Sequence, residues 1–143
     1  MSYIKWFEQH SLKHKNIVDK LLKKGFVKDQ IIDYFDYDNM VKNEVSFCPL
    51  YAKDKKCHHM DELNCYLCAC PNFRFNDNGI KKYEDKQQYS FCNIDSKDGK
   101  QSTYGDKIHQ NCSLCTIPHH KDYIYKYFDY DWNIIMKDCK CQI

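Results

Sequence analysis

A chain of 143 residues has the length of one domain, and its aromatic share of 15% is too high for a disordered polypeptide. Acidic and basic residues are interleaved around a net charge of +2, with no basic stripe to neutralise phosphates, so a protein partner is favoured over nucleic acid. No apolar run approaches the roughly 20 residues of a spanning helix, and no membrane association is expected.

Residues 1–44 predict a helical hairpin that packs on the rest of the chain. The first helix is expected from Ser11, a good N-cap, to Lys24, with Gly25 as the stop. The second helix is expected over residues 28–41. The apolar positions that recur at helical spacing in these two stretches are Leu12, Ile17, Val18, Leu21, Leu22, Ile31, Ile32, Phe35 and Met40.

Two histidines, His10 and His14, lie four residues apart and can share one helix face. Imidazoles at this spacing can hold a metal ion together, but no third ligand is close in the sequence. We therefore predict two solvated histidines on a lysine-rich face.

A short repeat flanks the middle of the chain, because residues 34–38 and 127–131 both read Tyr-Phe-Asp-Tyr-Asp. Each copy ends an apolar helical pattern, while the segments around the copies differ. We predict two amphipathic helices that pack together, with Tyr and Phe inward and Asp outward. An acidic and aromatic docking patch is the alternative.

The helical period ends at Val45, and residues 45–120 predict a loop-rich, cysteine-rich domain. Strong turn signals stand at residues 76–79 and 95–99, and short strands can pair over residues 80–94. The domain has few aliphatic residues, so it cannot bury a large apolar core by itself.

Residues 121–143 predict a C-terminal helix followed by a tail with two cysteines. Pro118 suits the first helical turn, and apolar residues then recur at helical spacing. Cys139 and Cys141 are read as loose tail thiols, with a cap on a metal site as the alternative. The expected fold class is α+β, with a small, metal-stabilised lobe between the N-terminal hairpin and this helix.

Eight of the ten cysteines and five of the seven histidines lie between residues 48 and 120. The first residues show no apolar segment or cleavage site typical of a signal peptide, so a reducing cytoplasm is expected. In that compartment a cysteine-rich segment predicts metal binding rather than disulfides. Two C-x-x-C pairs, Cys65/Cys68 and Cys112/Cys115, are typical turns that direct two thiolates at one ion.

Eight cysteines suit two four-ligand zinc sites better than one. Adjacent side chains in Cys68-Ala69-Cys70 tend to diverge, which suggests interleaved sites with Cys68 in one and Cys70 in the other. His58 and His119 are either ligands or hydrogen-bond donors to a metal-bound sulfur. The candidate ligands are Cys48, Cys57, His58, Cys65, Cys68, Cys70, Cys92, Cys112, Cys115 and His119.

These motifs resemble the cysteine-rich small domain family over about residues 46–122. The resemblance is carried by Cys48-Pro49, Cys57-His58, Cys65-x-x-Cys68-x-Cys70-Pro71 and Cys112-x-x-Cys115 with the following His119. It implies a zinc-finger-like domain that binds metal at the matched positions, and it implies no established reaction. Family members commonly carry a further cysteine where this chain reads Phe73-Arg74-Phe75, and Cys92 can take over that role.

Three functions compete on this pattern. The first is a non-enzymatic module in which two zinc ions hold a scaffold that contacts another macromolecule. The second is an iron–sulfur protein in electron transfer or redox sensing, although the cysteine spacing departs from the common ferredoxin runs. The third is a metal-dependent enzyme, which ranks last because no acid–base constellation accompanies a vacant ligand position.

Overall fold

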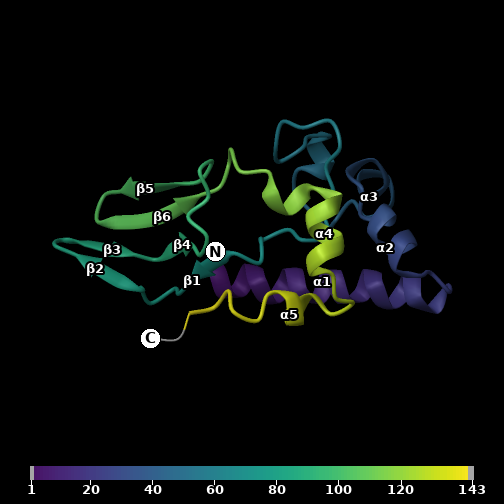
Figure 1. Ribbon diagram of the computed structural model, residues 1–143, viewed down its shortest axis with the longest axis horizontal. Coiled ribbons are helices and arrows are strands. Elements are labelled where there is room, and N and C mark those ends of the chain that lie inside the picture. Colours follow the sequence, from purple (N-terminus) through teal and green to yellow (C-terminus); the bar gives the residue numbers. More distant parts are fainter. Residues whose placement is uncertain (1, 142–143) are drawn as a thin grey trace.

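The computed structural model describes residues 2–141, and it begins with one long helix, α1 (Tyr3–Lys23; Figure 1). The prediction of a helix start at Ser11 is therefore wrong. Ser2 is the N-cap and accepts a hydrogen bond from the amide three residues on (3.3 Å). The carboxylate of Asp77 accepts from the first two helical amides (2.8 and 3.0 Å), and a cap so distant in sequence leaves no local signal.

His10 and His14 are buried on α1, so the prediction of two solvated histidines is also wrong. The ring of His10 stacks on Trp6 with 4.6 Å between centroids and lies 5.1 Å from Trp132. His14 stacks on Phe35 at 4.9 Å. Both histidines occupy positions of the apolar stripe, and the aromatic residues around them come from other parts of the chain.

The second predicted helix, residues 28–41, is two helices in the structure, α2 (Lys28–Tyr34) and α3 (Tyr37–Asn43). At the break between them, Asp36 pairs with Asn64 as an isolated β-bridge. This long-range pairing takes backbone groups away from a continuous helix, and the sequence pattern of the helix alone does not indicate it. α2 follows α1 after a short turn at residues 24–27, in which Gly25 has a φ of +82°.

Two small sheets occupy the other end of the molecule (Figure 1). One pairs β1 with β4, and the other has the order β2-β3-β6-β5, with a parallel β3–β6 pair between two antiparallel hairpins. The strands are β1 (Phe73–Phe75), β2 (Lys81–Tyr83), β3 (Lys86–Gln88), β4 (Ser90–Cys92), β5 (Lys100–Tyr104) and β6 (Lys107–Asn111).

The strands β5 and β6 were not expected from the sequence. They are rich in Lys, Gln, Ser and Thr and are mostly exposed or half-buried, so they show no apolar alternation. The two-residue loop that joins them, Gly105-Asp106, is the signal that could have found them, because Gly105 adopts a φ of +64°.

The chain returns to helices after the sheets, with a 3₁₀ turn η2 (Ile117–His119) that includes Pro118, then α4 (Lys121–Tyr127) and the short α5 (Trp132–Ile135). The tail then pairs with β1: the Phe75 amide donates to the Cys139 carbonyl, and the Cys141 amide donates to the Phe75 carbonyl (2.8 Å each). Cys139 is fully buried, so it is no loose thiol.

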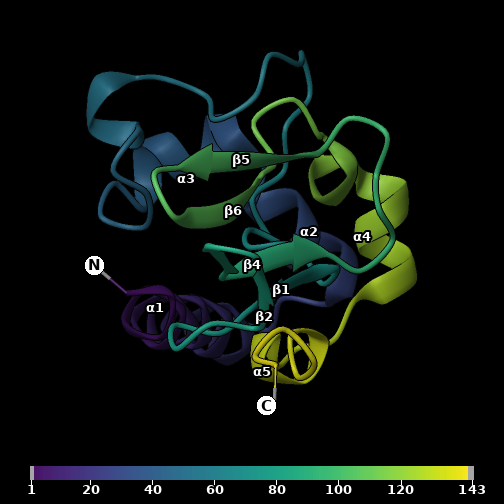
Figure 2. The same cartoon turned by 90° about the vertical axis from the view of Figure 1, so that its left-hand side faces the viewer.

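One buried core draws on all three predicted segments. Figure 2 shows α1 end-on, with α5 and the β1–β4 pair close beside it. The largest fully buried side chains of this core are Trp132, Tyr66, Phe35, Phe75, Leu21, Ile31, Ile32, Met40, Leu67, Ile124, Met136 and His14. The cysteine-rich segment therefore contributes to the same core as the helices, chiefly through residues 63–67.

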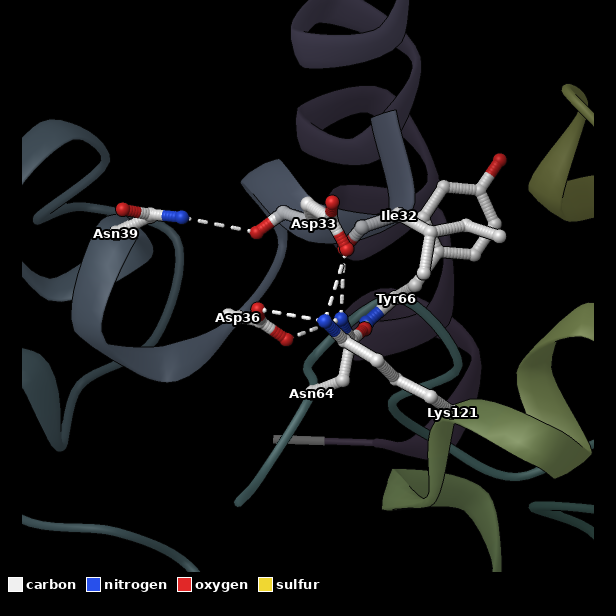
Figure 3. Close-up of polar contacts among 7 residues, drawn as sticks. All are labelled: Ile32, Asp33, Asp36, Asn39, Asn64, Tyr66 and Lys121. Carbon is white, nitrogen blue, oxygen red and sulfur yellow. Dashed lines mark hydrogen bonds and ion pairs between the residues drawn. The ribbon is translucent and has the colours of Figure 1, made fainter. Parts of the chain in front are cut away.

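A polar cluster joins α2, residue 64 and the N-terminus of α4 (Figure 3). Lys121 forms ion pairs with Asp33 (2.8 Å) and Asp36 (2.9 Å), while the Asn64 amide donates to Asp36 (2.9 Å) and to the Ile32 carbonyl (2.7 Å). The two helices that end in the repeated pentapeptide thus lie together. In the second copy Phe128 packs inward and stacks on Tyr66 (5.0 Å between centroids), whereas Tyr127 and Tyr130 are exposed, so the prediction of inward tyrosines is wrong there.

The molecule is an α+β fold in which terminal helices flank a strand region, as predicted. Among residues 2–141, none of the helices combines the length and the apolar character needed to cross a lipid bilayer.

Candidate metal centre

The two Cys-Pro turns of the chain are built alike. Burial raises the pKa of the Cys48 thiol, and hydrogen bonds from the amides of Leu50 and Tyr51 to its sulfur oppose that effect. Burial likewise raises the pKa of Cys70 to about 11, against amide hydrogen bonds from the same two relative positions, Asn72 and Phe73. Amides that point at a sulfur favour the thiolate, which is the form that binds metal.

The Cys-x-Cys segment between the C-x-x-C pair and the second Cys-Pro turn has a left-handed backbone. Ala69 and Cys70 have φ values of +88° and +63°, which are uncommon for residues other than glycine. This conformation turns the chain between Cys68 and Cys70. The two thiols belong to different neighbourhoods, as the divergence of a C-x-C motif suggested.

The first neighbourhood, the first cysteine group, consists of Cys48, Cys57, Cys65 and Cys68. A hydrogen bond from the Cys68 thiol lowers the pKa of Cys65 and raises that of Cys68. Cys57 is an exposed residue, but its sulfur atom is partly buried. This burial raises the pKa of the Cys57 thiol to about 11, and the charges of Cys65 and Cys48 raise it further. These mutual effects place the four sulfurs within electrostatic reach of one another.

Two histidines meet the first cysteine group at Cys57. The Sγ atom of Cys57 lies 3.1 Å from Nδ1 of His58 and 3.6 Å from Nε2 of His119. The three ligand atoms all lie within 4.8 Å of one another, and they are the only such set of Cys, His, Asp or Glu residues within residues 2–141. We call this set the compact centre.

Backbone carbonyls fix the tautomers of both histidines. Nδ1 of His119 donates to the carbonyl of Asn64 (2.9 Å), and Nε2 of His58 donates to the carbonyl of Cys112 (3.0 Å). Each ring therefore presents its unprotonated nitrogen to Cys57. Burial lowers the pKa of His119 to about 4, which keeps that ring neutral at pH 7. A ligating histidine in a metal site is oriented in the same way.

A tyrosine lies beside the first cysteine group, although the sequence analysis did not select it as a candidate. Tyr51 is buried, and its hydroxyl has no hydrogen-bond partner of normal geometry within residues 2–141. Burial raises its pKa, and the nearby sulfurs of Cys65 and Cys68 raise it further. A buried hydroxyl without an acceptor is costly, and a metal-bound thiolate at Cys65 would accept its proton in a hydrogen bond. This fits a site completed by metal.

The second neighbourhood, the second cysteine group, consists of Cys70, Cys92, Cys112 and Cys115. The β1–β4 pairing sets Cys92 opposite Phe73 and thus beside the second Cys-Pro turn. Burial raises the pKa of Cys112 to about 11, and the charges of the other three thiols add to this. Cys92 thus lies among the thiols next to the second Cys-Pro turn.

An apolar cavity of about 330 Å³ adjoins the second cysteine group. All four of its cysteines line this cavity, together with His58 and His119. The apolar part of the wall is formed by Tyr3, Trp6, Phe7, Ala69, Phe73, Phe75, Ile94, Ile117 and Pro118.

All ten candidate ligands thus lie in two neighbouring groups or between them. Of the remaining cysteines, Cys139 approaches the second cysteine group, since its thiol donates to the Cys70 carbonyl (3.5 Å). Burial raises the pKa of Cys139 to about 12, as expected of a thiol packed in the core. His109 contacts Tyr3, and His120 contacts Thr116. The ten cysteines all lie in the described part of the chain and form no disulfide among themselves.

No protein-family model matches the chain, and no curated protein or solved structure shows significant similarity to it. The resemblance to the cysteine-rich small domain family therefore remains a hypothesis that rests on the motifs.

Proposed function

We propose that the chain is a non-enzymatic metal-binding module in which zinc at the compact centre joins the helical core to the cysteine-rich segment. The observation that supports this most is the fixed orientation of His58 and His119 toward Cys57. Two neutral imidazoles and a thiolate are a donor set that zinc accepts, and a thiol of the first cysteine group can supply the fourth ligand.

The second cysteine group binds metal in the same proposal, which gives two metal sites in all. The folded lobe then serves as a scaffold for another protein in the cytoplasm, because the interleaved charges of the chain offer little to a phosphate backbone. The proposal assigns no reaction.

The test is the metal content of protein produced and purified without oxygen. We expect the variant Cys57→Ser to lose about one zinc per chain relative to the wild type, since it removes the sulfur on which both histidines converge. The matched control is His59→Ala, which changes an exposed neighbour outside the centre and should keep that zinc. The loss of the same amount of zinc in both variants, or a wild-type protein without zinc, would contradict the proposal.

Cobalt substitution adds a structural readout. Co²⁺ in a tetrahedral site with a thiolate ligand should give intense visible bands and a sulfur-to-metal charge-transfer band in the near ultraviolet, both weakened in Cys57→Ser and unchanged in His59→Ala.

A further inference from the structure

We propose that the second cysteine group holds a polynuclear iron–sulfur cluster of the four-iron class, while the compact centre holds a single ion. This inference rests on the proposed function in that it requires the second cysteine group to bind metal. It differs in the kind of metal site that the four thiols form.

The spacing of the thiols is the first reason. Four sulfurs bound to one zinc at about 2.3 Å stand roughly 3.8 Å apart at the corners of a tetrahedron. No three of the sulfurs of Cys70, Cys92, Cys112 and Cys115 lie within 4.8 Å of one another, because the compact centre is the only such set in residues 2–141. On a four-iron cluster each thiolate binds a different iron at the corner of a cube, so its sulfurs stand farther apart.

The cavity beside the thiols is the second reason. The cavity that all four cysteines line measures about 330 Å³, whereas a water-sized sphere needs only about 10–15 Å³. A single ion would leave most of this volume empty. An inorganic cluster of iron and sulfide is larger than one ion and would occupy more of the space that the four thiols line.

The character of the wall is the third reason. Phe73, Phe75, Ile94, Ile117 and Pro118 line the cavity, so the wall beside the thiols is mostly apolar. A hydroxyl also contacts one of the thiols, since Oγ of Ser96 lies 3.2 Å from Sγ of Cys115. Hydrogen bonds to the sulfurs are one of the means by which proteins set the reduction potential of a cluster.

The experiment measures iron, acid-labile sulfide and zinc in the full chain, isolated without oxygen or reconstituted with ferrous iron and sulfide. We expect about four irons and about four sulfides per chain and a broad absorbance near 400 nm that bleaches on reduction. The variant Cys92→Ser should lose most of this absorbance, whereas Cys141→Ser, whose thiol belongs to neither group, should keep it.

A second variant separates an effect on the cluster from a failure to fold. Ser96→Ala should retain iron, sulfide and absorbance but shift the reduction potential to a more negative value, because one hydrogen bond that stabilises the reduced, more negative cluster is lost. Ser96→Thr, which keeps a hydroxyl, should leave the potential near that of the wild type. An equal shift in both variants would contradict the placement of the cluster.

The outcomes for the two proposals differ. A colourless protein with about two zinc ions per chain overturns the cluster and leaves the proposed module intact. Iron and sulfide without zinc support the cluster and overturn the zinc assignment of the compact centre. A chain that binds neither metal overturns both.

Discussion

The two cysteine groups share their local construction and differ in what supports them. Each combines a Cys-Pro turn with a C-x-x-C pair, but the first group lies against Tyr51, Leu63 and Leu67, which belong to the buried core. The second group lies between short, largely exposed strands and an open cavity. Apolar packing can hold the first group in place without metal, whereas we expect the second group to need a bound metal for most of its stability.

Removal of all metal should produce the largest effect, on the order of 10 kcal/mol for the metal-dependent part of the chain. In a chelator and a thiol reductant, we expect the amides of β5, β6 and residues 112–115 to lose their protection from hydrogen exchange. The amides of α1 and of residues 63–67 should remain protected because they belong to the apolar core. Equal loss of protection in both regions would show that the two groups do not differ in support.

The two core histidines, His10 and His14, make the stability of the core beside the first cysteine group depend on pH. Burial lowers the pKa of His10 and of His14 to about 3, with smaller contributions from Lys13 and from His10 itself, respectively. In the unfolded chain both titrate near their ordinary value of about 6.5. The unfolded state therefore takes up protons first as the pH falls below about 6.5, and stability present at pH 7 is lost toward pH 3.

At pH 5 this loss amounts to about 2 kcal/mol for each histidine. The measurement is the urea midpoint followed by tryptophan fluorescence at pH 7 and pH 5, with metal bound at both. The variant His14→Phe keeps an aromatic ring without a titrating group, so its loss between the two values should be smaller by about 2 kcal/mol. Metal ligands titrate in both proteins, and their contribution cancels in the comparison.

The sequence indicated the candidate ligands of the cysteine-rich segment more directly than it indicated the packing of the core. The candidate ligands could be chosen because cysteine and histidine carry their chemistry in any fold. His10 and His14 were misplaced because a periodicity of apolar residue types excludes histidine, although the partners that bury them, Phe35 and Trp132, are aromatic. The grouping of Cys92 with Cys70 depends on the register of β1 with β4, which no local pattern encodes.

Asn64 links the core to the compact centre, and its side chain should matter more for stability than for metal. The amide group donates to Ile32 and Asp36 and accepts from the Tyr66 amide (2.9 Å), all within a buried site. Asn64→Ala should lower the free energy of unfolding by about 2–3 kcal/mol, because it leaves the buried Tyr66 amide without a partner and removes the hydrogen bonds to Ile32 and Asp36. The carbonyl that orients His119 remains, so the zinc content should not change.

The matched control for this variant is Asn39→Ala, which removes one exposed hydrogen bond to the Asp33 carbonyl (2.9 Å; Figure 3). We expect a change below about 0.5 kcal/mol, as for surface substitutions in general. Loss of zinc in Asn64→Ala would show that the core and the compact centre form one cooperative unit rather than two.

Lys121 should have the smallest effect, although it forms two ion pairs at the same junction (2.8 and 2.9 Å). A hydrogen bond from its ammonium group to Asp33 raises its pKa, but the side chain is 40% exposed and water screens the pairs. Lys121→Met should lower the free energy of unfolding by less than about 1 kcal/mol, and 1 M salt should reduce the difference further. Lys15→Met, which breaks the exposed pair with Asp19, is the matched control and should change stability by a smaller amount. A loss above about 2 kcal/mol at Lys121 that salt does not reduce would mean that the junction of α2 and α4, rather than apolar packing, supports the first cysteine group.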